Sequence, residues 1–116
     1  MAKVSIQLLD TNIWLELLLE QERADEVRVL LSSIQSSNIA ITEFSIYSIG
    51  IILQHYKKIN VFKEFISDLF DKNDTVRKVL GNEELKTIPE VIKKFNIDFD
   101  DAYQYIAAKS DDCILV

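Results

Sequence analysis

Glycine and proline are scarce in this sequence. Its 116 residues include two glycines and one proline. So few turn formers make an all-β fold unexpected and favour long helices joined by short connections. The two glycines, Gly50 and Gly81, stand alone, which argues against a glycine-rich phosphate loop.

Cysteine and histidine are represented once each. Cys113 cannot form an internal disulfide, so we expect it to be a small buried side chain in a reducing compartment. His55 has no second histidine with which to build a zinc site, and we expect it at the surface or near a helix cap. Disulfide-stabilised and zinc-binding classes are therefore not expected.

Long apolar runs and a basic excess are also missing. Residues 1–9 are too short for the apolar core of a signal peptide, and the most apolar stretch, 44–53, contains two serines. A span needs about 20 apolar residues, so we expect a cytoplasmic protein with no membrane segment. The net charge of −6 argues against a large basic surface for nonspecific nucleic-acid binding. A metal nuclease stays open, because clustered carboxylates are themselves a source of negative charge.

Short apolar runs alternate with amphipathic helical patterns. With 48% apolar residues, we expect residues 1–116 to form a single domain. Segment 43–56 is predicted to be a central, mostly buried helix capped by Thr42, with a strand as the competing interpretation, and Pro89 should break the helical pattern near Ile88. The patterns predict strands at 3–9, 39–41, 74–80 and 113–116, the last buried on both faces, and helices at 13–18, 24–34, 43–56, 61–70, 82–95 and 98–109. This order indicates an α/β fold with a small parallel sheet flanked by helices.

The triplet Asp10-Thr11-Asn12 directly follows the apolar run 6–9. It places a carboxylate at the end of a buried strand and Asn12 at a helix start. In a parallel sheet, the ends of strands and the starts of helices lie along one edge, which is where open α/β sheets bind ligands. That edge is expected to carry five acids, namely Asp10, Glu43, Asp98, Asp100 and Asp101.

Acids gathered at one edge indicate a metal site. Mg²⁺ and Mn²⁺ bind carboxylate oxygens and keep waters for a substrate phosphate, which suits phosphodiester hydrolysis. One metal suffices for a Lewis-acid role, and two give an in-line clamp. Helix capping is the alternative for Glu43, Asp98 and Asp100, since acids stabilise the first turn of a helix. Asp10 offers no large capping gain beyond Thr11 or Asn12, so a functional role is favoured there.

Three segments carry a family resemblance, namely Leu8-Leu9-Asp10-Thr11-Asn12-Ile13, Ile39-Ala40-Ile41-Thr42-Glu43-Phe44-Ser45 and Asp98-Phe99-Asp100-Asp101-Ala102-Tyr103. They resemble the landmarks of PIN domains, which are metal-dependent ribonucleases with a small parallel sheet between helices. The resemblance spans nearly the whole chain and implies a PIN-like three-layer fold, Mg²⁺ or Mn²⁺ as cofactor and an RNA substrate. Many single-domain members are toxins of VapBC-type toxin–antitoxin pairs, which implies an antitoxin peptide as partner.

The resemblance also assigns residues. It makes Asp10 the first acid and Asp101 the aspartate of the Asp-Ala pair, with Thr11 or Asn12 orienting the first acid or a bound water.

Two departures concern the remaining acids. The family's second acid lies inside the central helix, at a position that Ser48 occupies here. Glu43 is the only acid in that segment, and five residues of helix turn it roughly 140° away from Ser48. The family also carries a fourth aspartate after its last strand, whereas this sequence stops at Val116, so Asp98 or Asp100 is expected to supply an extra carboxylate.

The sequence leaves two functions open. The first is a metal-dependent endoribonuclease that uses Asp10, Glu43 and Asp101, with auxiliary acids, as the toxin of a toxin–antitoxin pair. The second is a catalytically impaired PIN-like domain that acts as a protein-interaction module, with itself or an antitoxin-like peptide. Large apolar side chains support a homo-oligomer, although most are typical of a core: Trp14, Phe62, Phe65, Phe70, Tyr103 and Tyr105.

Overall fold

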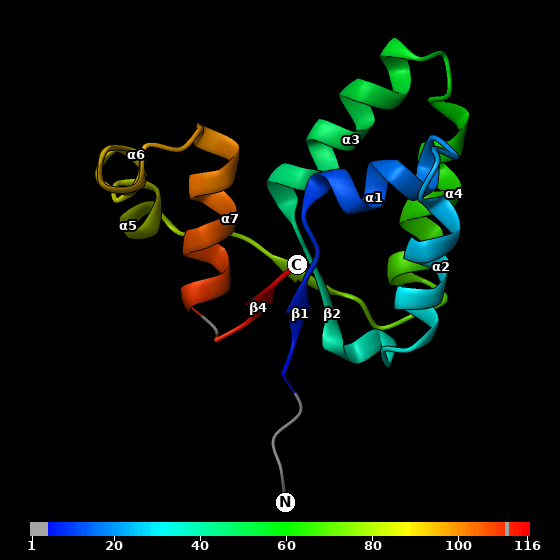
Figure 1. The fold of residues 1–116 in the computed structure, drawn as a ribbon, viewed down its shortest axis with the longest axis horizontal. Coiled ribbons are helices and arrows are strands. Elements are labelled where there is room, and N and C mark those ends of the chain that lie inside the picture. Colours follow the sequence, from blue (N-terminus) through cyan, green and yellow to red (C-terminus); the bar gives the residue numbers. More distant parts are fainter. Residues whose placement is uncertain (1–4, 111) are drawn as a thin grey trace, which may run out of the picture.

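The computed structural model describes residues 5–110 and 112–116. Within these residues, a four-stranded parallel sheet runs in the order β3-β2-β1-β4. The strands are β1 (Gln7–Leu8), β2 (Ile39–Thr42), β3 (Val76–Lys78) and β4 (Ile114–Leu115). The sheet lies between two groups of helices, which confirms the predicted α/β class and three-layer arrangement (Figure 1).

Two groups of helices cover the two faces of the sheet (Figure 1). Along β1, Leu8 and Leu9 belong to different core clusters, because successive strand side chains point to opposite faces. Leu9 and Ile41 pack on the first group, which comprises α1 (Thr11–Leu18), α2 (Ala24–Ser32), α3 (Glu43–His55) and α4 (Asn60–Phe70). Leu8 and Ala40 pack on the second group, which comprises α5 (Asn82–Leu85), α6 (Ile88–Phe95) and α7 (Phe99–Ser110). A short 3₁₀ turn, Ser36–Asn38, leads from α2 into β2.

The helix boundaries follow local signals in the sequence. Thr42 caps α3 as predicted, since its hydroxyl oxygen accepts the Ser45 N–H at 3.0 Å. The expected break near Ile88 is also present, because Pro89 lies in the first turn of α6, where its missing N–H costs nothing. Asn96 ends α6 in the left-handed conformation. The strand alternative for segment 43–56 is wrong.

Three expectations about burial need correction. Helix α3 buries Ile46, Ile49 and Leu53, but Tyr47 is 55% and Ile51 69% exposed, because the core contacts only one side of the helix. Strand β4 is not buried on both faces: Ile114 is 50% exposed, since β4 is an edge strand of the described sheet. Cys113 is half-buried rather than fully buried. The part of the predicted strand at 3–9 that precedes residue 5 lies outside the described residues.

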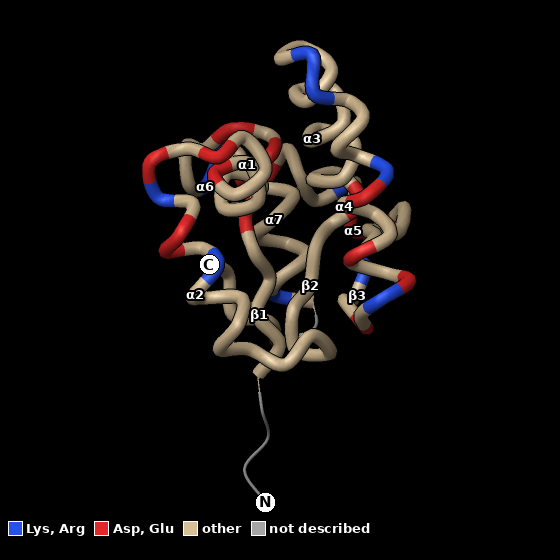
Figure 2. The backbone as a smooth tube through the Cα atoms, turned by 90° about the vertical axis from the view of Figure 1, so that its right-hand side faces the viewer, with Lys and Arg blue, Asp and Glu red and all other residues tan. Residues whose placement is uncertain are grey.

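Charge is unevenly distributed over the backbone (Figure 2). Acidic segments lie around α1 and the start of α7, while a basic segment lies at the far tip of α3 (Figure 2). No helix among the described residues is long and apolar enough to cross a bilayer.

Candidate functional site

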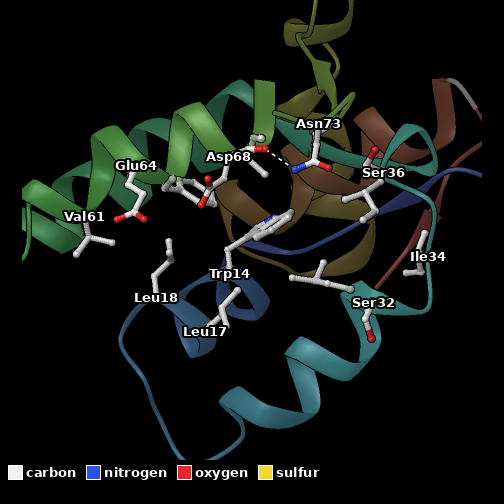
Figure 3. A pocket seen from close by; sticks show the side chains of 15 residues that line it. Trp14, Leu17, Leu18, Ser32, Ile34, Ser36, Val61, Glu64, Asp68 and Asn73 are labelled. Atoms are coloured by element: carbon white, nitrogen blue, oxygen red, sulfur yellow. Dashed lines mark hydrogen bonds between the residues drawn. The ribbon is translucent and has the colours of Figure 1, made fainter. Parts of the chain in front are cut away.

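An apolar cavity of about 580 Å³ lies between α1, α2 and α4 (Figure 3). Trp14, Leu18 and Phe65 line it, and Glu64 and Asp68 contribute acidic side chains. Asn73 donates a side-chain hydrogen bond of 2.7 Å to the Asp68 carbonyl oxygen, which ties the end of α4 to the loop before β3. The acids predicted from the sequence do not line this cavity, so their chemistry belongs elsewhere.

Asp10 lies where β1 passes into α1. Its backbone N–H donates to the Val116 carbonyl at 2.9 Å, which continues the β1–β4 ladder. Its carboxylate accepts the Asn12 N–H at 3.3 Å, so Asp10 is the N-cap of α1. This corrects the sequence argument, which gave Asp10 no large capping role. The second carboxylate oxygen is left for another partner.

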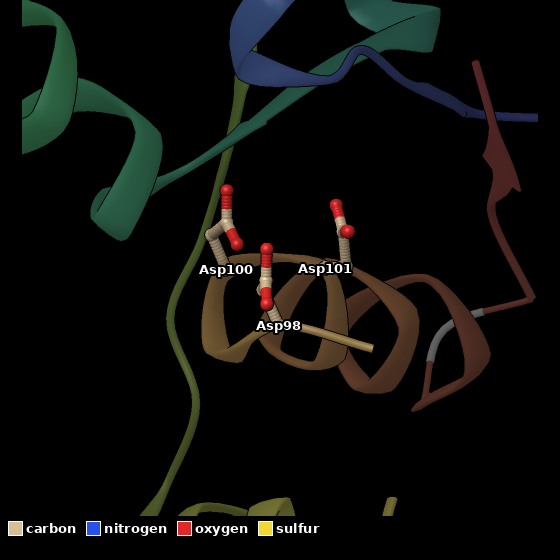
Figure 4. A group of neighbouring side chains, drawn as sticks. All are labelled: Asp98, Asp100 and Asp101. Atoms are coloured by element: carbon tan, nitrogen blue, oxygen red, sulfur yellow. The ribbon is translucent and has the colours of Figure 1, made fainter. Parts of the chain in front are cut away.

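Three aspartates project together from the start of α7 (Figure 4). One carboxylate oxygen from each of Asp98, Asp100 and Asp101 lies within 4.8 Å of the others, and all three residues are exposed. They point towards the start of α1 (Figure 4). The Asp98 carbonyl oxygen accepts the Ala102 N–H at 3.0 Å, so the chain enters the helix immediately after Asp98.

A hollow of about 380 Å³ brings Asp10 to this cluster. Asp10, Asp98 and Asp100 all line it, and so does Ser48 of α3. Its remaining walls come from α1, α3 and α7, through Thr11, Asn12, Leu15, Phe44, Ile52 and Phe99. We call this hollow, together with Asp101, the acidic site.

The acids of the acidic site interact electrostatically. Partial desolvation raises the pKa of Asp101 above its ordinary value, and the negative charges of Asp100, Asp10 and Asp98 raise it further. Asp101 therefore lies within electrostatic reach of Asp10 on a different element. Like charges held together in this way favour either a proton or a cation between them.

A buried polar network lies beneath the acidic site. Gln104 of α7 is 1% exposed, and its side-chain amide donates to the Ser45 hydroxyl and, at 3.4 Å, to the Thr11 hydroxyl. Thr11 and Ser45 are also hydrogen-bonded to each other at 2.7 Å, and Thr42 joins Ser45 at 3.0 Å. The network therefore ties together the starts of α1 and α3 and the first turns of α7, which carry the acids.

Sequence reasoning did not identify Gln104. The available signal was one polar residue in the otherwise apolar stretch 102–108. Such a residue indicates a buried polar side chain, which needs hydrogen-bond partners, but the sequence does not identify those partners. Its Oε1 atom is buried without a hydrogen-bond partner among the described residues.

Glu43 is placed differently from the other predicted acids. One of its carboxylate oxygens accepts the Tyr47 hydroxyl at 2.6 Å, and the other lies 3.5 Å from the Arg77 guanidinium of β3. The hydrogen bond to Glu43 is the main reason why the pKa of Tyr47 is raised. Ser48, and not Glu43, lines the hollow that contains Asp10.

The donor set of the acidic site fits a hard divalent cation. Its groups are carboxylates, which Mg²⁺ and Mn²⁺ prefer over nitrogen or sulfur ligands. Exposure of Asp98, Asp100 and Asp101 leaves room for coordinated water and a substrate. Asp10, Asp98, Asp100 and Asp101 are the residues that could hold such an ion.

Comparisons with known proteins agree with this architecture. A family model described as PIN domain matches residues 8–116. No curated protein sequence gives a significant match.

Several solved structures are similar to the chain in fold. VapC20 from Mycobacterium tuberculosis, a toxin that cleaves the sarcin-ricin loop, has a TM-score of 0.79 and 11% identity, covering 92% of this chain and 84% of that one. A toxin–antitoxin complex from Klebsiella pneumoniae has a TM-score of 0.72 and 16% identity, with coverages of 94% and 82%. FitAcB from Neisseria gonorrhoeae has a TM-score of 0.71 and 19% identity, with coverages of 95% and 85%.

Proposed function

The chain belongs to the PIN-domain family, and on that premise we propose that it is a metal-dependent endoribonuclease, acting as one domain over residues 1–116. The proposal rests on the position of Asp10 near the three aspartates at the start of α7, at one edge of the sheet. Within the described residues, none of these four acids forms an ion pair with a cation. Their mutual repulsion does not favour folding, whereas their carboxylates suit metal binding.

The proposed ligands of Mg²⁺ or Mn²⁺ are Asp10 and Asp101, with Asp98 and Asp100 as auxiliary acids. When bound, the ion would polarise a phosphodiester and lower the pKa of a coordinated water. The proposed site does not include Glu43, because both of its carboxylate oxygens already have partners in Tyr47 and Arg77.

The chain's own residues hold the acids in place. The hydrogen bond from the Asn12 N–H fixes one carboxylate oxygen of Asp10. The hydrogen bond from the Asp10 N–H to the Val116 carbonyl fixes its backbone at the end of β1. The Thr11 hydroxyl is hydrogen-bonded to Ser45 and Gln104, so the first turn of α1 cannot shift without breaking these hydrogen bonds. Asn12 and Ser48 line the same hollow and are placed to orient water or substrate oxygens.

The proposed partner is a small antitoxin, and the proposed place of action is the cytoplasm. One similar solved structure is a toxin–antitoxin complex. The apolar cavity of Figure 3 offers a partner segment a large apolar surface apart from the acidic site. Exposed apolar side chains such as Tyr47 on α3 and Ile114 on β4 support self-association into a homo-oligomer.

Calorimetric titration with Mn²⁺, followed by an RNA cleavage assay with the same preparations, tests the proposal. We expect the native chain to bind Mn²⁺ and to cleave single-stranded RNA only when the ion is present, and we expect Asp101→Asn to lose both. Asp71→Asn, which removes an exposed aspartate at the end of α4, is the matched control and should retain both. If the native chain binds no divalent ion, the alternative of a catalytically impaired interaction module replaces the nuclease.

A further inference from the structure

A second hollow, of about 670 Å³, continues the acidic site along α1 and α3. Asn12, Leu15 and Ile52 line both hollows, so the two form one continuous groove. The second hollow extends to His55 and Tyr56 at the end of α3. From Ser48 to His55 the helix rises about 10 Å, so a ligand spanning the groove is longer than one nucleotide.

The second hollow ends at two aromatic side chains, and two lysines follow them in the chain just beyond its lining. His55 and Tyr56 are exposed, with their rings edge to face and 5.1 Å between centroids. Lys57 and Lys58 follow directly, and neither forms an ion pair within the described residues. Figure 2 shows this basic tip of α3 well apart from the acidic segments.

Lys57 occupies a position at which lysine is a costly choice for stability. Its φ of 59° lies in the left-handed region, where glycine or asparagine ends a helix more easily. Its N–H donates to the Gln54 carbonyl and the Lys58 N–H to the Leu53 carbonyl, so the helix end itself needs only backbone atoms. The ammonium group is therefore available for another role.

We infer that this groove binds the single-stranded segment of RNA that extends from the cleaved phosphodiester, with a base stacked on Tyr56 and phosphates held by Lys57 and Lys58. The inference rests on the ribonuclease function proposed above. Aromatic stacking together with flanking cations is how proteins hold single strands without reading their sequence. The one acid lining the second hollow, Glu16, already accepts the Arg23 N–H at 2.9 Å.

The first test changes the charge of the groove. The probe is a short, fluorescein-labelled, single-stranded RNA of mixed sequence, whose binding is followed by fluorescence anisotropy in Ca²⁺ buffer over a range of salt concentrations. The double variant Lys57→Gly, Lys58→Ala should bind more weakly, with the slope of log affinity against log salt reduced by about 1.4 for two lost phosphate contacts. Its melting temperature should not fall, since glycine suits the φ of position 57.

The matched control is Lys93→Ala, Lys94→Ala. These lysines lie in the last turn of α6, on the other side of the molecule (Figure 1), and Lys94 lies over an aromatic ring. Their substitution removes the same charge as the groove variant. We expect affinity and salt slope close to those of the native chain. Equal losses in the two double variants would assign the effect to net charge and overturn the inference.

The second test changes the stacking surface. Tyr56→Ala should weaken RNA binding roughly tenfold, whereas Tyr56→Phe should retain it, because stacking needs the ring and not the hydroxyl. If Tyr56→Ala changes the sedimentation of the protein and leaves RNA affinity unchanged, this face serves self-association and the inference is wrong. RNA cleavage by the native chain separates the two proposals. If the native chain cleaves RNA and the groove variants bind RNA with native affinity, the groove inference alone is wrong. If the native chain neither binds nor cleaves RNA, both proposals are wrong.

Discussion

The start of α3 and the paired starts of α1 and α7 are all helix N-termini bearing acids, but their surroundings differ. At the start of α3, Glu43 is paired with the Arg77 guanidinium and accepts a hydrogen bond from the Tyr47 phenol. At the starts of α1 and α7, the acids face one another, and their mutual repulsion raises the pKa of Asp101 beyond the effect of desolvation. An acid at a helix start is therefore a candidate metal ligand only where the fold does not pair it with a cation.

We expect the strongest effect from substitution of Asp10, because it removes one of the acids that lie together at the starts of α1 and α7. Both Asp10→Asn and Asp10→Ala remove a charge that the proposed metal needs, so Mn²⁺ binding measured by calorimetry should be lost in both. The two variants should differ in stability, because Asn can replace the cap to the Asn12 N–H and Ala cannot. We expect Asp10→Ala to be about 1 kcal/mol less stable than Asp10→Asn in urea unfolding. Unchanged Mn²⁺ affinity in both variants would reduce Asp10 to a helix cap.

Gln104→Leu should have the next largest effect, because it removes the hydrogen bonds that join α7 to Thr11 and Ser45 while leaving the acids in place. Loss of such supporting contacts typically weakens metal affinity by roughly 10- to 100-fold. Stability should change little, since the variant also removes the unpartnered Oε1 of Gln104 from the interior. Calorimetry with Mn²⁺ and thermal unfolding measure the two quantities. A large loss of stability with native affinity would make Gln104 a structural residue only.

Asp101→Asn should change how the stability of the metal-free protein depends on pH. The folded-state pKa of Asp101 is raised above its ordinary value of 3.8, so ionisation of Asp101 opposes folding as pH rises through that folded pKa. At neutral pH in chelator, the neutral variant should therefore be slightly more stable than the native chain, by less than about 1 kcal/mol because the site is exposed. The advantage should disappear once pH falls below 3.8, where Asp101 is protonated in both states. An advantage that persists there would mean that ionisation of Asp101 is not its source.

Glu43→Gln should have the smallest effect. Its ion pair with Arg77 is partly exposed, and such pairs contribute about 0 to 1 kcal/mol. Mn²⁺ affinity and RNA cleavage should stay at native values, because Glu43 does not line the acidic site. If cleavage is abolished while unfolding is unaffected, then Glu43 leaves its partners during the reaction and must be added to the site.

Much of the fold follows from local patterns in the sequence. The alternation of apolar runs and helical stripes predicted β2, β3 and the helices on either side, and Pro89 predicted the division between α5 and α6. These features depend on backbone chemistry within a few residues. Burial was harder to predict: Ile51 and Ile114 are as apolar as core residues, yet they are exposed because no described element covers them.

The candidate site divides in the same way. Asp10, Asp98, Asp100 and Asp101 could be placed at one edge from topology alone, since the ends of parallel strands and the starts of helices share that edge. The orientation of Glu43 could not be predicted from topology, because its partner Arg77 lies on a strand distant in the sequence. Gln104 was missed for the same reason, since its partners Thr11 and Ser45 belong to other elements.

Local patterns specify where strands and helices follow one another along the chain and which of their ends carry carboxylates, because hydrophobic period and capping are properties of neighbouring residues. Tertiary contacts specify which carboxylates lie together, which one is paired with a cation, and where a groove leads away from them. Those outcomes depend on distances between segments far apart in the chain, and electrostatic interactions depend on that separation and on exposure to water.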